Sequence, residues 1–150
     1  MPLVSRKGIL AITAVIDVAI NARLRPVSAK ALAARHTLPP RHLEPVLQAL
    51  VREGILRGVR GPRGGYRLAK ERRRISVGDI VRAAETADEE NGEDNAPRSE
   101  LGAHIVAPFI QSLQGDVMAK LDSITVDDLC QRARAAGVDM GEKITADFTI

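Results

Sequence analysis

Apolar side chains recur at helical spacing along the first third of the chain, and turn-forming residues separate the repeats. Residues 5–23 predict an amphipathic first helix, because four apolar side chains follow one another at three- or four-residue intervals: Ile9, Ile12, Ile16 and Ala19. Ser28 then predicts the N-cap of a short second helix over residues 29–35, with Leu32 facing inward. Residues 36–38 are expected to form a turn.

A third helix is expected to open at Pro39-Pro40 and to end at Gly54, because prolines are tolerated in a first turn and glycine commonly follows a helix. Its inward stripe has the spacing of a helix that buries one face, and consists of Leu43, Val46, Leu47, Leu50 and Val51. The opposite side carries Arg41, Glu44, Gln48 and Arg52. Pro45 lies just past the first turn, where it removes one backbone hydrogen bond and can kink the helix.

Two short strands joined by a glycine-rich turn are expected next. The first strand begins at Ile55, Leu56 and Val59, and the second at Tyr66 and Leu68. The turn between them, GPRGG at 61–65, contains too much glycine for regular structure, and glycine lets the backbone approach another surface closely. It is not a nucleotide phosphate loop, because no Gly-Lys-Ser/Thr follows and the turn joins two strands. This order of parts over residues 25–70 predicts a winged helix-turn-helix.

The second half of the chain predicts three more helices. Residues 77–86 form a fourth helix capped by Ser76, and the acidic segment that follows has almost no large apolar residue, so a mobile loop is expected there. A long helix then starts either at Leu101 or at Pro108. A closing helix, capped by Thr125, runs over residues 126–136.

The long helix carries an apolar face that a small domain cannot cover by itself. The face consists of Phe109, Ile110, Leu113, Val117, Leu121 and Ile124. A second copy of the same helix could cover it, which predicts a symmetric dimer, although the face could also line a ligand pocket. The expected fold is therefore mainly α with a two-stranded β wing. Its parts are a winged helix-turn-helix domain (1–86), an acidic loop (87–100), a dimerisation and closing-helix unit (101–137) and a flexible tail (138–150).

Charge is distributed unevenly between the two halves. Residues 1–75 hold 16 Lys and Arg against 4 Asp and Glu, whereas residues 76–150 hold 6 against 15. A basic half beside an acidic half predicts a nucleic-acid surface joined to a part with another role.

Composition excludes several classes of protein. The single cysteine rules out an intramolecular disulfide and fits a reducing cytoplasm. No apolar run approaches the ~20 residues of a membrane span. Asp17 interrupts the apolar run near the N-terminus, which favours a helix over a signal peptide. No acid, base and nucleophile are seen to converge, so we do not expect an enzyme.

Three stretches resemble the IscR-like (BadM-type) winged-helix transcription regulators. They are residues 27–70, with RGPRGGYRLA at 60–69, then ISVGDIVRAAE at 75–85 and ITVDDL at 124–129. The resemblance covers most of residues 5–130. It implies a homodimer on double-stranded DNA, with third helices in two major grooves, wings in the adjoining minor grooves, and long C-terminal helices that cross at the dimer interface.

One departure from the family pattern concerns sensing. Sensors in this family often hold an iron–sulfur cluster through three cysteines between the fourth helix and the dimerisation helix. That stretch has no cysteine here, and Cys130 lies in the closing helix. Because a cluster of the usual kind needs several thiolate ligands, we expect no cluster, metal or other cofactor. The chain resembles the cluster-free members of the family. These respond to an effector protein or a small molecule, or have no known signal.

The expected function is that of a DNA-binding transcription regulator, a repressor rather than an activator. The third helix is expected to read bases through Arg41, His42 and Gln48, with Pro40 beside them in the DNA-binding surface. The resemblance places Arg41 and His42 where family members contact bases. The wing is expected to enter the minor groove through Arg57, Arg60, Gly61, Arg63, Gly64, Gly65, Tyr66 and Arg67. Ser28 and Arg35 are better placed for phosphates. The alternative is a winged-helix module that binds protein and reads no DNA sequence. His104 and Cys130 are expected to be a surface histidine and a small apolar residue.

Overall fold

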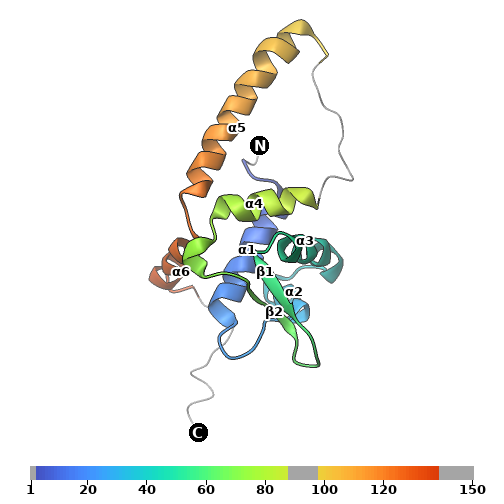
Figure 1. Cartoon of the computed structure of the whole chain (residues 1–150), viewed down its shortest axis with the longest axis vertical. Coiled ribbons are helices and arrows are strands. Elements are labelled where there is room, and N and C mark those ends of the chain that lie inside the picture. Colours follow the sequence, from blue (N-terminus) through green and yellow to red (C-terminus); the bar gives the residue numbers. More distant parts are fainter. Residues whose placement is uncertain (1–2, 88–97, 139–150) are drawn as a thin grey trace.

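The protein folds into a helical body that carries a small β wing and a long helical arm (Figure 1). The structure, a computed structural model, describes residues 3–87 and 98–138. In chain order the elements are α1 (Arg6–Asn21), α2 (Ala29–His36), α3 (Pro40–Arg52), β1 (Leu56–Val59), β2 (Gly65–Leu68), the 3-10 turn η1 (Arg72–Arg74), α4 (Val77–Thr86), the π-helical turn η3 (Gly102–Val106), α5 (Ala107–Asp122) and α6 (Val126–Ala135). The predicted fold class, mainly α with a two-stranded antiparallel wing, is confirmed.

Side-chain caps explain why several helices begin where the sequence predicts. Ser28 Oγ accepts the Ala31 N–H at 3.0 Å, and Ser76 and Thr125 each form a capping box with an aspartate three residues on. A cap of this kind stabilises a helix by about 1 kcal/mol. The predicted bounds of the fourth helix, 77–86, therefore agree with α4.

The structure confirms the predicted first helix, and its most deeply buried residues lie beside the four that predicted it. Its buried apolar side chains are Ala11, Ala14, Val15 and Val18, whereas Ile9 is exposed and Ile12, Ile16 and Ala19 are only half-buried. Ile12, Ile16 and Ala19 pack against the core from its edge, because α1 is apolar around most of its circumference and a 3.6-residue period alone does not fix which residues lie deepest. Helix α4 packs most extensively on α1.

Helix α3 buries the predicted stripe of residues except for one position. Leu43, Val46, Leu47 and Leu50 are buried, but Ala49 joins them in place of Val51, which is 38% exposed. The helix runs unbroken through Pro45, whose ring lies on the exposed side. Leu32 of α2 is fully buried, as predicted.

The long helix takes the earlier of its two predicted starts. A helical turn at Leu101 leads through the π turn η3 directly into α5. Pro108 has no N–H to donate to the carbonyl of His104, and the Ala107 N–H bonds the Gly102 carbonyl in the wider π pattern. The predicted acidic loop falls mainly on residues 88–97, and the predicted tail mainly on residues 139–150, which lie outside the described residues.

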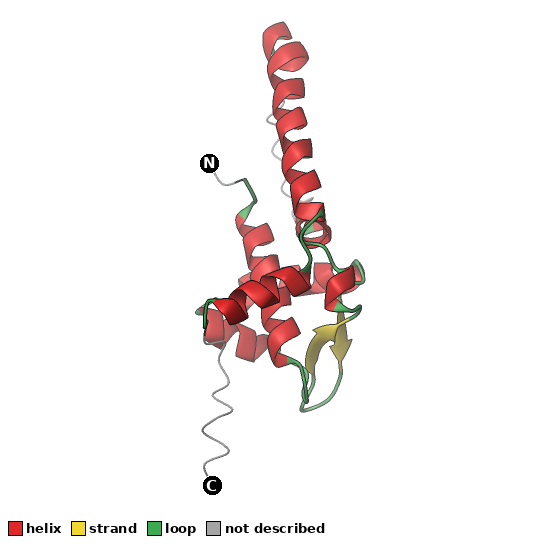
Figure 2. Ribbon diagram, turned by 90° about the vertical axis from the view of Figure 1, so that its left-hand side faces the viewer, coloured by secondary structure: helices red, strands yellow, loops and turns green. Residues whose placement is uncertain are grey.

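Helix α5 stands away from the body, whereas the closing helix α6 returns to it. None of the α5 side chains is buried, and α5 projects as an arm in both views (Figures 1 and 2). Val126 and Cys130 of α6 belong to the same hydrophobic core as α1. The unit expected over residues 101–137 thus divides between an arm and a part of the body.

A short clasp joins the base of the arm to the body. The Val77 N–H donates to the Ile124 carbonyl at 2.8 Å, and the Val126 N–H donates to the Ile75 carbonyl at 2.9 Å. These bonds flank an antiparallel bridge between Ser76 and Thr125, the two capping residues. The clasp therefore fixes where α5 leaves and α6 enters the body.

An ion pair strengthens this junction. Arg82 of α4 binds Asp122 at the end of α5 in bidentate fashion, at 2.8 and 2.7 Å. A Cβ at position 78 would overlap the Asp122 carboxylate, so glycine is needed for this close approach.

Candidate nucleic-acid interface

The outward side of α3 forms the first part of the candidate interface. Because the apolar stripe of α3 packs into the core, the predicted base-reading residues Arg41, His42 and Gln48 are all exposed, as is Pro40. Arg41 and His42 lie in the first turn. Helix-turn-helix proteins direct that end of the recognition helix at base edges in the major groove.

A tight turn sets α3 relative to α2. Thr37, the C-cap of α2, adopts a left-handed conformation with φ 52° and ψ 51°. The Leu38 N–H donates to the Ala33 carbonyl at 2.9 Å. Left-handed backbone at a β-branched residue costs about 1–3 kcal/mol, so neighbouring contacts must hold the turn.

Those contacts come from Asp17 of α1, a fully buried carboxylate. Asp17 accepts hydrogen bonds from Arg35 Nε at 2.9 Å, from Arg35 Nη2 at 2.7 Å and from Asn21 Nδ2 at 3.0 Å. His36 Nε2 lies 2.6 Å from Oδ2 of Asp17. Burial favours a higher pKa for Asp17, but the hydrogen bonds from Arg35, Asn21 and His36 outweigh it and hold the pKa below its ordinary value. The charged carboxylate thus anchors the C-terminal end of α2 to α1.

The sequence reasoning missed this role of Asp17. The signal that could have found it is a single carboxylate between Val15 and Val18 on the buried face of a helix, where a charge requires a partner. In the structure, Arg35 binds Asp17 and so helps to position α2 against α1. Its side chain is 21% exposed, and the phosphate contact predicted for it stays a prediction.

The wing is built on close backbone approaches. Strands β1 and β2 pair in antiparallel register, and Val27 forms an isolated bridge with Tyr66 of β2. The Val27 N–H donates to the Tyr66 carbonyl at 3.0 Å, and the Tyr66 N–H donates to the Val27 carbonyl at 2.8 Å. A Cβ at Gly65 would overlap the Val27 carbonyl group. Gly61 has a φ of 115°, which other residues rarely adopt. These glycines therefore have structural reasons to be present, whatever the wing binds.

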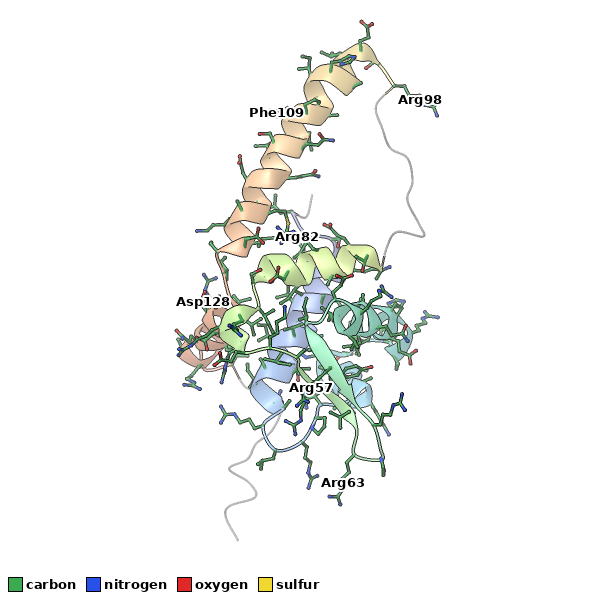
Figure 3. All side chains as sticks on the ribbon, in the orientation of Figure 1. Arg57, Arg63, Arg82, Arg98, Phe109 and Asp128 are labelled. Carbon is green, nitrogen blue, oxygen red and sulfur yellow. The ribbon has the colours of Figure 1, made fainter. Side chains whose placement is uncertain are left out.

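The wing arginines fall into two groups. Arg60 and Arg63 are exposed beside the turn, with Arg63 at the lower tip of the wing (Figure 3). Arg67 instead donates from Nη1 to the Ala22 carbonyl at 3.0 Å and from Nη2 to the Leu24 carbonyl at 3.3 Å. Arg57 is exposed and lies directly opposite Arg67 in the strand register.

Tyr66 faces the core rather than the tip of the wing. It is half-buried and packs against the hydrophobic core. Burial raises the pKa of Tyr66, and the carboxylate of Glu44 raises it further. The ring therefore connects β2 to the body.

The candidate interface combines the exposed side of α3 with the wing, and α5 lies outside it. Helix α3 packs against β1, and the wing projects from the end of the body opposite the arm (Figures 1 and 2). Figure 3 places Arg57 and Arg63 at the wing end, and Arg98 and Phe109 on the arm side. Residues 18–70 contain 11 Lys and Arg but only 2 carboxylates, Glu44 and Glu53. This excess of positive charge suits a polyanion.

The donor set for a metal is poor. No group of three or more His, Cys, Asp or Glu side chains that could hold a metal occurs within residues 3–87 and 98–138. Cys130 is buried, and burial raises the pKa of its thiol more than the nearby Arg72 lowers it. The thiolate that a metal or an oxidant requires is therefore disfavoured. Among the helices of the described ranges, none is long and apolar enough to cross a membrane.

Comparisons with known proteins agree with this geometry. A family model named Rrf2 and described as an iron-dependent transcriptional regulator matches residues 4–132. An HTH-type transcriptional regulator of Synechocystis is 33% identical over 138 residues, which is 92% of this chain and 94% of that protein. The IscR regulator of Escherichia coli is 37% identical over 79 residues, covering 53% of this chain and 49% of that protein.

Two solved structures extend the likeness over most of the chain. The structure of T. potens IscR aligns with a TM-score of 0.69 at 33% identity, covering 92% of this chain and 93% of that one. CymR, the global cysteine regulator of B. subtilis, aligns with a TM-score of 0.68 at 29% identity, covering 88% and 98% of the two chains. Since the family model spans most of its length, this protein belongs to the Rrf2 family of winged helix-turn-helix transcriptional regulators and is not an enzyme.

Proposed function

We propose that this protein is a sequence-specific repressor that binds a near-palindromic operator in double-stranded DNA as a homodimer, in the cytoplasm and without an iron–sulfur cluster. The observation that carries the proposal is the arginine-rich wing at the end of the body opposite the arm, whose strand β1 packs against α3, the helix with an exposed first turn. Likeness to structures named IscR and CymR supports the regulatory part of the proposal.

The two parts of the interface have different tasks in this proposal. Arg41, His42 and Gln48 read base edges in the major groove, where arginine can bond guanine O6 and N7 together. Arg60 and Arg63 enter the adjoining minor groove, which is narrow and electronegative in A·T-rich DNA. The compact turn of Gly61, Gly64 and Gly65 lets the wing backbone approach the groove. Ser28 keeps a hydroxyl proton that it can donate to a phosphate while its oxygen caps α2.

The dimer is proposed from the uncovered face of the arm. Phe109 is 60% exposed and Leu113 46% exposed, and Ile110 is exposed beside them. Val117, Leu121 and Ile124 continue the stripe toward the body, where they are half-buried. A contiguous apolar surface of this kind is unfavourable in water and marks an interaction site. A second copy of α5 supplies a matching surface by two-fold symmetry.

Repression is the simplest output of such a dimer. An operator that overlaps a promoter excludes polymerase when it is occupied, and this needs no additional contact by the protein. A footprint on genomic DNA that survives competitor DNA, with lower activity of the adjacent promoter, supports this function. Loss of all binding in competitor DNA would instead indicate a module that binds protein.

The residues of this chain do not fit an iron–sulfur cluster held by several cysteines, although the family description names iron. The chain has one cysteine, Cys130, and it lies buried in α6 rather than between α4 and α5. Iron–sulfur clusters require several thiolates. We therefore assign no step in DNA binding to iron.

Arg41→Ala is expected to change which sequences are bound, whereas Arg63→Ala is expected to weaken binding to all of them. Loss of a bidentate guanine contact costs ~1–3 kcal/mol of discrimination at one base pair, and loss of a minor-groove or phosphate contact carries less sequence information. Selection from randomised duplexes measures both. Arg52→Ala, in the last turn of α3, is the charge-matched control. An unchanged preferred site for Arg41→Ala would place base reading elsewhere.

Protein purified without oxygen is expected to be colourless and to bind its operator in the presence of an iron chelator. The reason is the missing cysteine triplet between α4 and α5. Visible absorbance together with iron and sulfide analysis provides the measurement. A stoichiometric cluster held through Cys130, His104 or carboxylates would contradict the proposal.

A further inference from the structure

The loop between α1 and α2 adds positive charge beside the wing. Arg23 and Arg25 are both exposed, and Leu24 between them is 94% exposed. No carboxylate occurs between residues 18 and 43 or between residues 54 and 70, so neither the loop nor the wing contains an acidic side chain. The sequence reasoning gave this loop no role.

The loop is fixed in place by the wing itself. Both terminal nitrogens of Arg67 donate to loop carbonyls, those of Ala22 and Leu24. On the other side of the loop, Val27 pairs with Tyr66 of β2. The backbone that carries Arg23 and Arg25 is thus attached to β2 at two points. Its charges are held beside the wing and do not hang free.

Arg57 extends this row of charge across the sheet. Arg57 lies directly opposite Arg67 in the antiparallel register, so the two side chains share one face of the wing. Leu56, Tyr66 and Leu68 occupy the other face and pack on the core. Like charges directly opposite each other destabilise a strand pair. A polyanion bound along this face would relieve that repulsion.

We infer that Arg23, Arg25 and Arg57 form a flank patch that binds phosphates of duplex DNA outside the half-site read by α3 and the wing tip. The inference rests on the proposed function, because it needs a DNA duplex that is already docked on α3. Duplex DNA is favoured over other polyanions because the patch is continuous with the wing and carries no carboxylate that would select a basic or zwitterionic partner. The contact is electrostatic, so it lengthens the footprint without adding sequence preference.

The test compares two operator duplexes. The operator is first selected by the wild-type protein from random DNA, and is then presented with no flanks or with about 10 base pairs on each side, roughly one helical turn. Wild-type protein is expected to bind the flanked duplex more tightly and with a steeper dependence on salt. The double variant Arg23→Ala/Arg25→Ala is expected to lose this advantage, with the salt slope falling by about 0.9 for each phosphate that the protein no longer neutralises.

Two controls separate the patch from general charge and from folding. Arg98→Ala/Arg132→Ala removes the same charge from exposed positions outside the patch, and is expected to keep the flank advantage. Arg23→Lys/Arg25→Lys is expected to restore most of the salt slope, since lysine also neutralises a phosphate. Thermal unfolding followed by circular dichroism checks that each variant folds.

The outcomes distinguish the patch from the proposed function. If wild-type protein selects an operator but gains nothing from flanks, or if Arg23→Ala/Arg25→Ala gains as much as wild type, the flank patch is wrong and the regulator stands. If wild-type protein selects no operator, the proposed function is wrong. The patch is then judged on random-sequence duplex, where equal binding by wild type and variant overturns it.

Discussion

Replacing Leu113 and Val117 with glutamate is expected to convert the proposed dimer into monomers and to abolish tight binding of the full operator. Leu113 is nearly half exposed on an arm with no buried side chain, and Val117 lies one turn closer to the body. In the proposed seam, each new carboxylate would be buried near its symmetry mate. Burying unpaired like charges costs several kcal/mol, so the seam is expected to open.

The winged body is expected to stay folded in this variant, because its core contains no side chain of α5. Light scattering measures the oligomeric state, and a footprint measures binding of the full operator and of single half-sites. Gln111→Glu/Ala119→Glu adds the same charge to the side of α5 opposite the stripe, and should remain a dimer. A Leu113→Glu/Val117→Glu protein that still dimerises would show that the interface lies elsewhere.

Asp17→Ala is expected to lower the free energy of unfolding by about 3 kcal/mol, at the low end of what breaking a buried ion pair costs. The substitution removes the acceptor for Arg35, His36 and Asn21. The cost stays at the low end because Arg35 is partly exposed and can recover some hydration. Chemical denaturation gives the value. Asp122→Ala, which breaks an exposed ion pair, is the control and should change stability far less.

DNA binding should fall along with stability, because Asp17 holds the end of α2 that leads into the turn before α3. Wild-type stability at this site should also depend on pH. The pKa of Asp17 is lower in the folded protein than its ordinary value, so its contribution is present above about pH 4 and is lost as the pH falls through the folded pKa. The difference in stability between wild type and Asp17→Asn should therefore shrink on acidification. A difference that is constant down to low pH would contradict the ionic role.

Local signals in the sequence were sufficient for the helix starts and the wing. Ser76 caps α4 together with Asp79 three residues on, and the glycine-rich stretch GPRGG marks the turn between β1 and β2, so each could be predicted from a few adjacent residues. The inward stripe of α3 was also predictable, because polar residues on the other side leave one rotational phase.

The features that could not be predicted depend on residues far apart in the chain. Asp17 and Arg35 are 18 positions apart, and Arg67 reaches carbonyls more than 40 positions away. No local pattern indicates which arginine will bind the protein's own backbone and which will stay exposed. The most deeply buried residues of α1 could not be predicted for a different reason, because a helix that is apolar around most of its circumference does not define its own orientation.

Because Ser76 and Thr125 pair in the clasp, the end of the arm meets the body beside the start of α4. The chain leaves the body after α4 and returns through α5 to the start of that same helix, where the backbone bonds of Val77 and Val126 receive it. One more turn of helix in α5 would carry the dimer seam about 5.4 Å farther from the body and leave the body core unchanged. The length of α5 would therefore set the distance between the two bodies of the proposed dimer. Related regulators with arms of different length would then bind operators of different spacing. They would also not pair with one another, and the packing of each body would be unaffected.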